Sequence, residues 1–209
     1  MDDDTPNLDS AYALKTPQES RALYAGWAET YDTGFAQETG YELHLHAAQA
    51  FATMGGTGPV LDVGAGTGLC GQALAALGVH PIEATDISPE MLHQAMQKGV
   101  YARAIEADLT QGLPIPNDTY SGIVSSGTFT TGHVGPTAFD ELLRVARPGA
   151  RFALSINVQH FQSAGFGAAF DRLGPTLSDL ILTETRIYGE RALGSHRDDT
   201  ALIASFRKR

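Results

Sequence analysis

One stretch decides the fold: Val60-Leu61-Asp62-Val63-Gly64-Ala65-Gly66-Thr67-Gly68. Its first four residues have the pattern of a short buried strand, and the alternating glycines that follow predict a tight turn before an apolar helix. Glycine permits a positive φ and lets a ligand approach the backbone with no Cβ in the way. The free N–H groups at the start of the helix attract polar or anionic ligand groups. We therefore expect a ligand site at the carboxyl end of the first strand of an open α/β sheet.

The segments after this stretch alternate between helix and strand patterns, which is typical of a parallel sheet. Expected helices cover about 69–77, 89–98 and 137–145, and a weaker one covers 166–173. Ser88 is expected to cap the second of these. Expected strands lie at 81–85, 103–107, 122–125, 151–157, 180–188 and 201–206, with a turn at 147–149. The pattern predicts one α/β domain.

The segments before this stretch look helical. Thr16 can cap a helix whose first turn suits Pro17, and Tyr24, Trp27 and Tyr31 fall on one face of it. A second helix is expected at 41–54. We predict a flexible tail at 1–16 and a single domain at 17–209, made of a helical lid (17–57) and a ligand-binding core (58–209).

Composition limits the classes of function. The 209 residues carry a formal net charge of −10, which opposes binding to a phosphate backbone. The single cysteine, Cys70, cannot form an internal disulfide, and no apolar run reaches membrane-spanning length. The acidic start, Met1-Asp2-Asp3-Asp4, is unlike a signal peptide. We expect a cytoplasmic protein with neither nucleic acid nor membrane as a partner; the oligomeric state is not indicated.

Two aspartates follow the next two expected strands. Asp86 can accept hydrogen bonds from both hydroxyls of a ribose, and Asp108 can accept one from an adenine amino group. Each has an alternative role in its turn: Asp86 as a turn or capping residue, although Ser88 already fills the capping position, and Asp108 as a loop aspartate. The glycines could likewise form a turn without a ligand. Together these residues predict a nucleoside site.

Nicotinamide dinucleotides and S-adenosylmethionine (SAM) both fit such a crevice. The dinucleotide fingerprint G-x-G-x-x-G places its third glycine where Leu69 stands here. Asp62, two residues before the turn, suits a cationic amino acid moiety better than a pyrophosphate. The spacing therefore favours SAM. An NAD(P)-dependent oxidoreductase and a non-catalytic nucleoside-binding protein remain as alternatives.

The chain resembles the class I SAM-dependent methyltransferases over about residues 24–206. The motifs that carry the resemblance are 60–68, Asp86-Ile87, 107–109, 120–126 and 147–151, and the run 127–136 is similar to the methyltransferase-like 27 branch. The resemblance implies a Rossmann-like, mostly parallel seven-stranded sheet with helices on both faces and an antiparallel last strand. Ser121-Gly122 stand where the family often has an aspartate, which argues against an acidic catalytic group on the fourth strand.

The resemblance also implies the site. SAM would be the cofactor, S-adenosyl-L-homocysteine the product, and a small molecule the methyl acceptor. Asp62 would anchor the amino acid moiety and Asp86 the ribose, while the aromatic residues of the first helix would cover the methyl group, although they could instead be a core stripe. The implied cofactor contacts are Tyr24, Trp27, Tyr31, Asp62, Gly64, Ala65, Gly66, Gly68, Asp86, Ile87, Met91, Asp108, Leu109 and Ser125.

His133 is the candidate general base. It follows the fourth strand, where the acceptor would lie, and an imidazole takes up a proton near neutral pH. The alternative is a structural histidine bonded to a loop carbonyl. His44 and His46 would point to different faces of a helix, so no metal site is expected.

Overall fold

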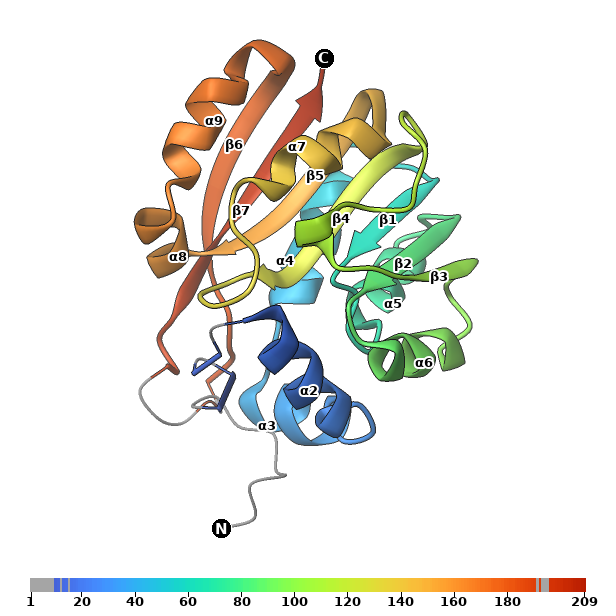
Figure 1. Cartoon of the computed structure of the whole chain (residues 1–209), viewed down its shortest axis with the longest axis vertical. Coiled ribbons are helices and arrows are strands. Elements are labelled where there is room, and N and C mark those ends of the chain that lie inside the picture. Colours follow the sequence, from blue (N-terminus) through green and yellow to red (C-terminus); the bar gives the residue numbers. More distant parts are fainter. Residues whose placement is uncertain (1–9, 12, 15, 191, 193–195) are drawn as a thin grey trace.

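A seven-stranded sheet with the order β3-β2-β1-β4-β5-β7-β6 runs through the computed structural model, which describes residues 10–11, 13–14, 16–190, 192 and 196–209 (Figure 1). Strand β7 pairs antiparallel with both of its neighbours, whereas β1 to β5 pair in parallel. The expected fold class is therefore confirmed. The strands are β1 (Val60–Val63), β2 (Ile82–Asp86), β3 (Arg103–Glu106), β4 (Tyr120–Phe129), β5 (Ala146–Asn157), β6 (Leu177–Arg186) and β7 (Thr200–Lys208).

Helices cover both faces of the sheet (Figure 1). One face carries α4 (Leu43–Thr53), α5 (Leu69–Ala76) and α6 (Pro89–Gln97), which share an apolar cluster with β1 and β2. The other face carries α7 (Ala138–Val145), α8 (Val158–Ser163) and α9 (Phe166–Leu173). Burial of these two apolar layers on either side of the strands is the main stabilising contribution to the fold.

Capping residues set where two helices begin. Thr16 Oγ1 accepts a hydrogen bond from the Glu19 N–H (3.2 Å), and the Glu19 carboxylate accepts one from the Thr16 N–H (3.1 Å). This reciprocal pair is a capping box for α2 (Pro17–Trp27). Ser88 Oγ accepts from the Met91 N–H (3.2 Å) at the start of α6. Both expected caps are confirmed.

One strand prediction and one helix prediction need correction here. Strand β5 begins at Ala146 rather than after the expected turn at 147–149, because Ala146 already pairs with Tyr120 before a shift of register. Helix α8 was not expected. It starts because Asn157, the last residue of β5, accepts a hydrogen bond from the His160 N–H (3.1 Å) and so caps a new helix.

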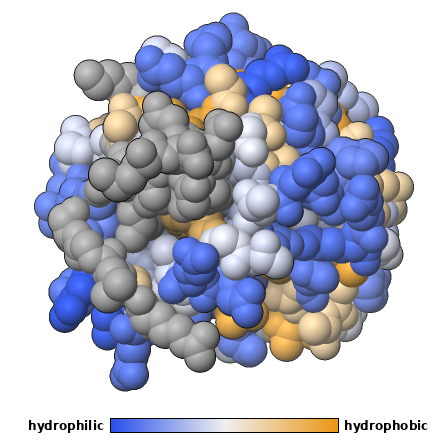
Figure 2. All heavy atoms as spheres, turned by 90° about the horizontal axis from the view of Figure 1, so that it is seen from below, coloured by the Kyte–Doolittle hydropathy of each residue, from blue (hydrophilic) through white to orange (hydrophobic). Residues whose placement is uncertain are grey.

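The N-terminal helices lie beyond one end of the sheet (Figure 1). They are α2, the π-helical segment η1 (Asp32–Ala36) and α3 (Gln37–Thr39). Figure 2 views the molecule from this end, where the described surface is mainly hydrophilic and hydrophobic residues gather in smaller patches. The apolar side chains of these elements therefore face inward, into a cluster that includes Trp27 and Phe35.

Parts of the expected tail and lid pack against the rest of the chain. Of the predicted tail, residues 1–9, 12 and 15 lie outside the described residues, whereas Ala11 and Leu14 are buried. These two positions belong to the packed part of the chain. Within the predicted lid at 17–57, helix α4 packs against the sheet through Ala47 and Phe51, so it is a core helix. In the part of the chain that the structure describes, no helix is long and apolar enough to cross a membrane.

Candidate functional site

A cavity of about 990 Å³, counted with its open mouth, lies where the carboxyl ends of β1 and β2 meet the N-terminal helices. Tyr24 and Tyr31 line it from the N-terminal side, opposite the glycine-rich turn. Of the predicted cofactor contacts, the cavity brings together Tyr24, Tyr31, Gly64, Ala65, Gly66, Asp86, Ile87, Met91, Asp108 and Leu109.

The three glycines of the turn have different roles. All have a positive φ, which only glycine adopts without strain: +63° at Gly64, +54° at Gly66 and +92° at Gly68. A Cβ at Gly64 would come within 2.0 Å of Thr128 Oγ1, and one at Gly68 within 2.8 Å of the Tyr101 ring. A Cβ at Gly66 would meet nothing within 4 Å. The turn thus packs through its outer glycines and leaves open space at its centre, where a ligand fits.

Asp86 lines the cavity at the end of β2. Its Oδ2 accepts a hydrogen bond from the Gly66 N–H (2.8 Å) and its Oδ1 accepts one from the Ser88 N–H (2.9 Å). A carboxylate offers about four lone-pair positions, so about two remain for a ligand. Burial raises the pKa of Asp86, and these backbone N–H groups oppose that rise. The geometry fits a pair of neighbouring ribose hydroxyls.

Asp108 and Leu109 line the far end of the cavity on the loop after β3. Asp108 Oδ1 accepts hydrogen bonds from the N–H and the hydroxyl of Thr110 (2.8 and 2.6 Å), which caps a short 3-10 turn. Asp108 therefore does act as a loop aspartate, the alternative role expected for it. Asp108 Oδ2 is not used in these bonds, so an adenine contact stays a prediction.

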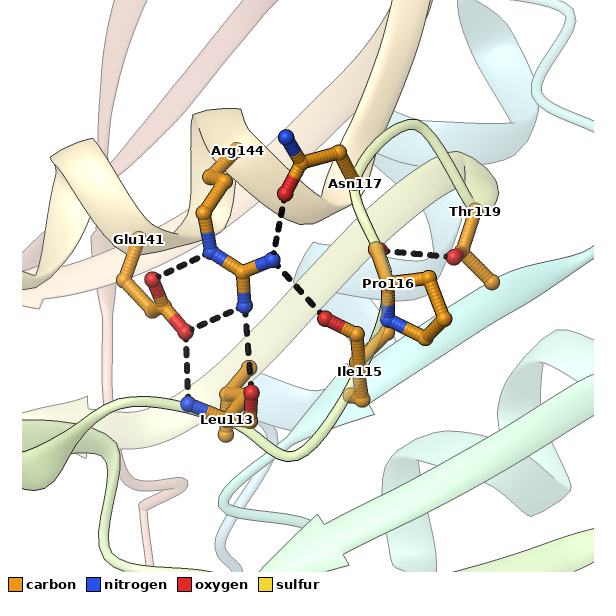
Figure 3. Close-up of polar contacts among 7 residues, drawn as sticks. All are labelled: Leu113, Ile115, Pro116, Asn117, Thr119, Glu141 and Arg144. Carbon is orange, nitrogen blue, oxygen red and sulfur yellow. Dashed lines mark hydrogen bonds and ion pairs between the residues drawn. The ribbon is translucent and has the colours of Figure 1, made fainter.

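The continuation of this loop is held by Arg144 on α7 (Figure 3). The guanidinium donates to both carboxylate oxygens of Glu141 (2.8 and 2.7 Å), to the carbonyls of Ile115 and Leu113 (2.8 and 3.1 Å), and to Asn117 Oδ1 (2.7 Å). Glu141 also accepts from the Leu113 N–H (2.5 Å). One ion pair thus fixes the loop that follows Asp108 and Leu109 to the neighbouring helix.

Asp62 lies behind the cavity, because it is fully buried and absent from the lining. Its Oδ2 accepts from the Tyr101 hydroxyl (2.6 Å), which itself accepts from the Gly71 N–H (3.1 Å). Its Oδ1 has no hydrogen-bond partner among the described residues. Burial raises the pKa of Asp62 to about 7. The structure shows Asp62 supporting the first turn of α5, and its predicted role as an anchor for an amino acid moiety stays a prediction.

Trp27, Ser125 and Gly68 do not line the cavity. Trp27 is 2% exposed and packs against Tyr24 and Phe35 with ring centroids 5.7 and 6.1 Å apart, so it supports the lid from behind. Ser125 is buried and donates to a β1 carbonyl (2.7 Å), whereas its neighbour Ser126 lines the cavity. The sequence pattern ended this strand at Ser125, whereas β4 continues to Phe129, and it missed that Ser126 rather than Ser125 lines the cavity.

Asp32 joins the lid to the glycine-rich turn. It accepts a hydrogen bond from Thr67 Oγ1 (2.5 Å) and forms an ion pair with Lys98, which follows α6. Sequence reasoning missed this contact, because the three residues are far apart along the chain and carry no shared motif. The contact holds Tyr31, the residue before Asp32, over the cavity.

A second cavity of about 510 Å³, counted with its opening, adjoins the first; we call it the acceptor chamber after the role that we propose for it below. The two cavities share Tyr24, Tyr31, Tyr41, Gly127 and His133. The chamber's further described lining is formed by Ala11, Phe35, Leu43, Phe129, Thr130, Ser155, Asn157, Ile187 and Tyr188. Most of its walls are therefore aromatic or aliphatic, with a few polar groups between β4 and β5.

His133 stands where the two cavities meet. Its Nδ1 lies 3.1 Å from the Thr131 carbonyl. A carbonyl only accepts hydrogen bonds, so Nδ1 carries the proton and Nε2 is an acceptor. Nε2 is buried and has no partner among the described residues. Burial lowers the pKa of His133, so the ring is neutral near pH 7. His133 therefore does bond a loop carbonyl, as the structural alternative expected. The same bond leaves Nε2 unprotonated and able to accept a proton.

The described residues contain no group of three or more His, Cys, Asp or Glu side chains arranged to hold a metal ion.

The chain is similar to known proteins over most of its length. Residues 60–149 match a family model described as a methyltransferase domain. Methyltransferase-like protein 27 from Homo sapiens is 31% identical over 78% of this chain and 69% of that protein. An 18S rRNA (guanine-N(7))-methyltransferase from Bos taurus is 39% identical over 32% of this chain and 23% of that protein. The N-methyltransferase NodS from Bradyrhizobium japonicum, solved with S-adenosyl-L-homocysteine, has the same fold (TM-score 0.58, 16% identity, 80% of this chain and 86% of that one).

Proposed function

We propose a small-molecule methyl acceptor for this chain, which belongs to the class I SAM-dependent methyltransferases and uses SAM as its cofactor. The observation that carries the proposal is the acceptor chamber. It adjoins the cavity built on the glycine-rich turn, its described lining is mostly apolar, and the unprotonated Nε2 of His133 lies where the two meet. A substrate of limited size fits such a chamber.

The residues of the first cavity, which we call the cofactor cavity, fit SAM. Open space above Gly66 admits the ligand close to the backbone. Asp86 retains lone pairs for ribose hydroxyls, and Ile87 and Leu109 offer apolar surface for an adenine. When bound, SAM supplies an electrophilic methyl group on a sulfonium and departs as S-adenosyl-L-homocysteine after in-line attack.

The chain's own residues then position the acceptor and exclude water. Tyr24 and Tyr31 stay neutral phenols, because burial raises the pKa of each well above its usual value. They close the cavity from the lid side, and Asp32 holds that side down on Thr67 and Lys98. Alignment of two reactants in a closed site lowers the barrier by several kcal/mol. His133 Nε2 accepts the proton that the acceptor loses.

An RNA acceptor is the second candidate, since the relative from Bos taurus is named an rRNA methyltransferase. That alignment covers only 32% of this chain. A net charge of −10 opposes a polyanion, and the described chamber lining includes no lysine or arginine. These observations favour a small molecule. A protein that binds a nucleoside without turnover would have no need of a proton acceptor at His133.

Methyl-labelled SAM tests the proposal. The purified protein is incubated with labelled SAM and either total RNA or an extract of molecules below about 1 kDa, and the label is followed into each fraction. We expect label in the small-molecule fraction, and about 10²-fold to 10⁴-fold slower transfer in His133→Asn. The matched control is His93→Asn, since His93 is exposed on α6 and bonds only Gln97 (2.9 Å). Label in RNA alone would contradict the proposal, as would full activity of His133→Asn.

A further inference from the structure

We propose that the acceptor chamber selects an uncharged single-ring hydroxyarene that also carries a second oxygen able to accept a hydrogen bond. The inference rests on the proposed function and names the substrate class of that same site. Three independent features carry it: the walls of the chamber, the acceptor atom of His133 and the amide of Asn157.

The walls of the chamber favour a flat, uncharged body. Tyr31 and Phe35 stack with ring centroids 5.1 Å apart, and Tyr188 packs edge-on to Phe35 at 6.3 Å. Aromatic faces and edges pack well against another ring. Among the described lining residues there is no Asp, Glu, Lys or Arg to pair with a ligand charge. A charged group moved from water into these walls would lose its hydration without an ionic partner.

His133 requires a hydrogen-bond donor on the ligand. Its Nδ1 donates to the Thr131 carbonyl, which fixes Nε2 as a lone-pair acceptor. Nε2 is buried and unpaired among the described residues, and a buried acceptor without a partner is unfavourable. A hydroxyl at the boundary between the two cavities satisfies it. The same hydroxyl oxygen then lies on the side where the cofactor cavity begins.

Asn157 offers hydrogen-bond donors to a ligand in the chamber. Its Oδ1 accepts from the His160 N–H (3.1 Å), and a backbone N–H only donates, so this contact settles which amide atom is the oxygen. Nδ2 carries two N–H donors, and the residue is only 5% exposed and lines the chamber. A carbonyl or ether oxygen on the ligand pairs with them.

The transfer step balances with these groups. The hydroxyl proton moves to His133 Nε2, the hydroxyl oxygen forms a bond to the methyl carbon, and the bond from that carbon to sulfur breaks. The electron pair of the broken bond stays on sulfur and neutralises the sulfonium. The products are an aryl methyl ether, S-adenosyl-L-homocysteine and an imidazolium that releases its proton to water.

Calorimetric titration of the full chain saturated with S-adenosyl-L-homocysteine tests the substrate class by binding alone. Four probes share one ring size: 4-hydroxyacetophenone, 4-ethylphenol without the carbonyl, anionic 4-hydroxybenzoate and cationic tyramine. We expect 4-hydroxyacetophenone to bind at least about 10-fold more tightly than any of the other three. Tighter binding of either charged probe would overturn the inference, as would no binding of any probe.

Asn157→Asp tests the donor directly. Aspartate keeps an oxygen that caps α8, but in its ionised form it has no proton to donate. We expect the affinity for 4-hydroxyacetophenone to fall to that for 4-ethylphenol, while the affinity for 4-ethylphenol stays within about 2-fold. Asn157→Ser keeps the cap without adding a charge, and it should show the same selective loss because its shorter side chain does not reach the position of Nδ2. An equal loss for both phenols, or no loss, would overturn the inference.

Binding of S-adenosyl-L-homocysteine to the same samples separates two kinds of failure. Unchanged binding shows that each variant is folded and that the cofactor cavity is intact, so a failed probe series then counts against the substrate class alone. Loss of that binding in the unmodified chain would instead count against the proposed function.

Discussion

The two cavities are built in different ways. The cofactor cavity is formed largely by backbone: a glycine turn, N–H groups aimed at Asp86 and the ends of two neighbouring strands. The acceptor chamber is formed by side chains from the lid, from the ends of β4 and β5 and from Ile187-Tyr188 near the other end of the chain. A backbone site tolerates few substitutions, whereas walls made of side chains can change without changing the fold. In the proposed function, the first cavity binds the cofactor and the second selects the acceptor.

Gly66→Ala should have the largest effect and tests whether the backbone alone makes the cofactor site. The added Cβ would meet no protein atom within 4 Å, so it would occupy space needed by the ligand. We expect at least about 100-fold weaker binding of S-adenosyl-L-homocysteine in a calorimetric titration. Gly78→Ala is the matched control, since Gly78 has a similar φ of +78° and equally open surroundings outside the cavity. Equal effects of both changes would show that strain, not ligand space, matters.

The difference between a cavity built from backbone and a chamber built from side chains also explains which features could be predicted from the sequence. The parallel sheet, the turn and Asp86 follow from local patterns, because a strand, its glycines and the next strand end lie close together in the chain. Asp32 and the choice between Ser125 and Ser126 depend on tertiary packing, and no periodicity marks them. Helix α8 was missed because Asn157 both ends a strand and caps a helix. The chamber could not be predicted, since its walls meet only in the folded chain.

Arg144→Met tests whether side chains also support the cofactor cavity. The change removes the donors for the Ile115 and Leu113 carbonyls and leaves Glu141 without its ion pair. We expect a loss of about 2 kcal/mol in the free energy of unfolding, measured by chemical denaturation. Arg172→Met is the control, because Arg172 pairs with Asp140 on the exposed surface, and we expect no measurable change there. Equal stability of the two variants would contradict the anchoring role of Arg144.

Asp32→Ala should weaken the contact between the lid and the glycine-rich turn. The variant loses the contacts of Asp32 with Thr67 and Lys98, so the lid opens more often. We expect about 10-fold faster release of S-adenosyl-L-homocysteine in stopped-flow measurements, with little change in overall stability. The neighbouring change Thr33→Ala removes only an exposed contact to the Thr30 carbonyl (3.5 Å) and should not alter release. An unchanged rate in Asp32→Ala would show that this contact does not hold the lid.

The smallest expected effect is a pH dependence of stability caused by Asp62, which lies behind the glycine-rich turn. The folded chain raises the pKa of Asp62 from 3.8 to about 7, so the folded state binds more protons than the unfolded state between these values. Stability from this group is therefore present at low pH and is lost as pH rises through 7. We expect the unmodified chain to lose about 1 kcal/mol relative to Asp62→Asn between pH 6 and pH 8. Parallel stability curves for the two proteins would contradict the raised pKa.

The most direct test of the cofactor cavity is a calorimetric titration with S-adenosyl-L-homocysteine and with NADH, on the unmodified chain and on Asp86→Ala. We expect binding of S-adenosyl-L-homocysteine, no heat with NADH, and about 100-fold weaker binding in the variant, since two charge-assisted hydrogen bonds to the ribose are lost. Binding that is indifferent to Asp86, or a preference for NADH, would contradict the assignment of this cavity to SAM.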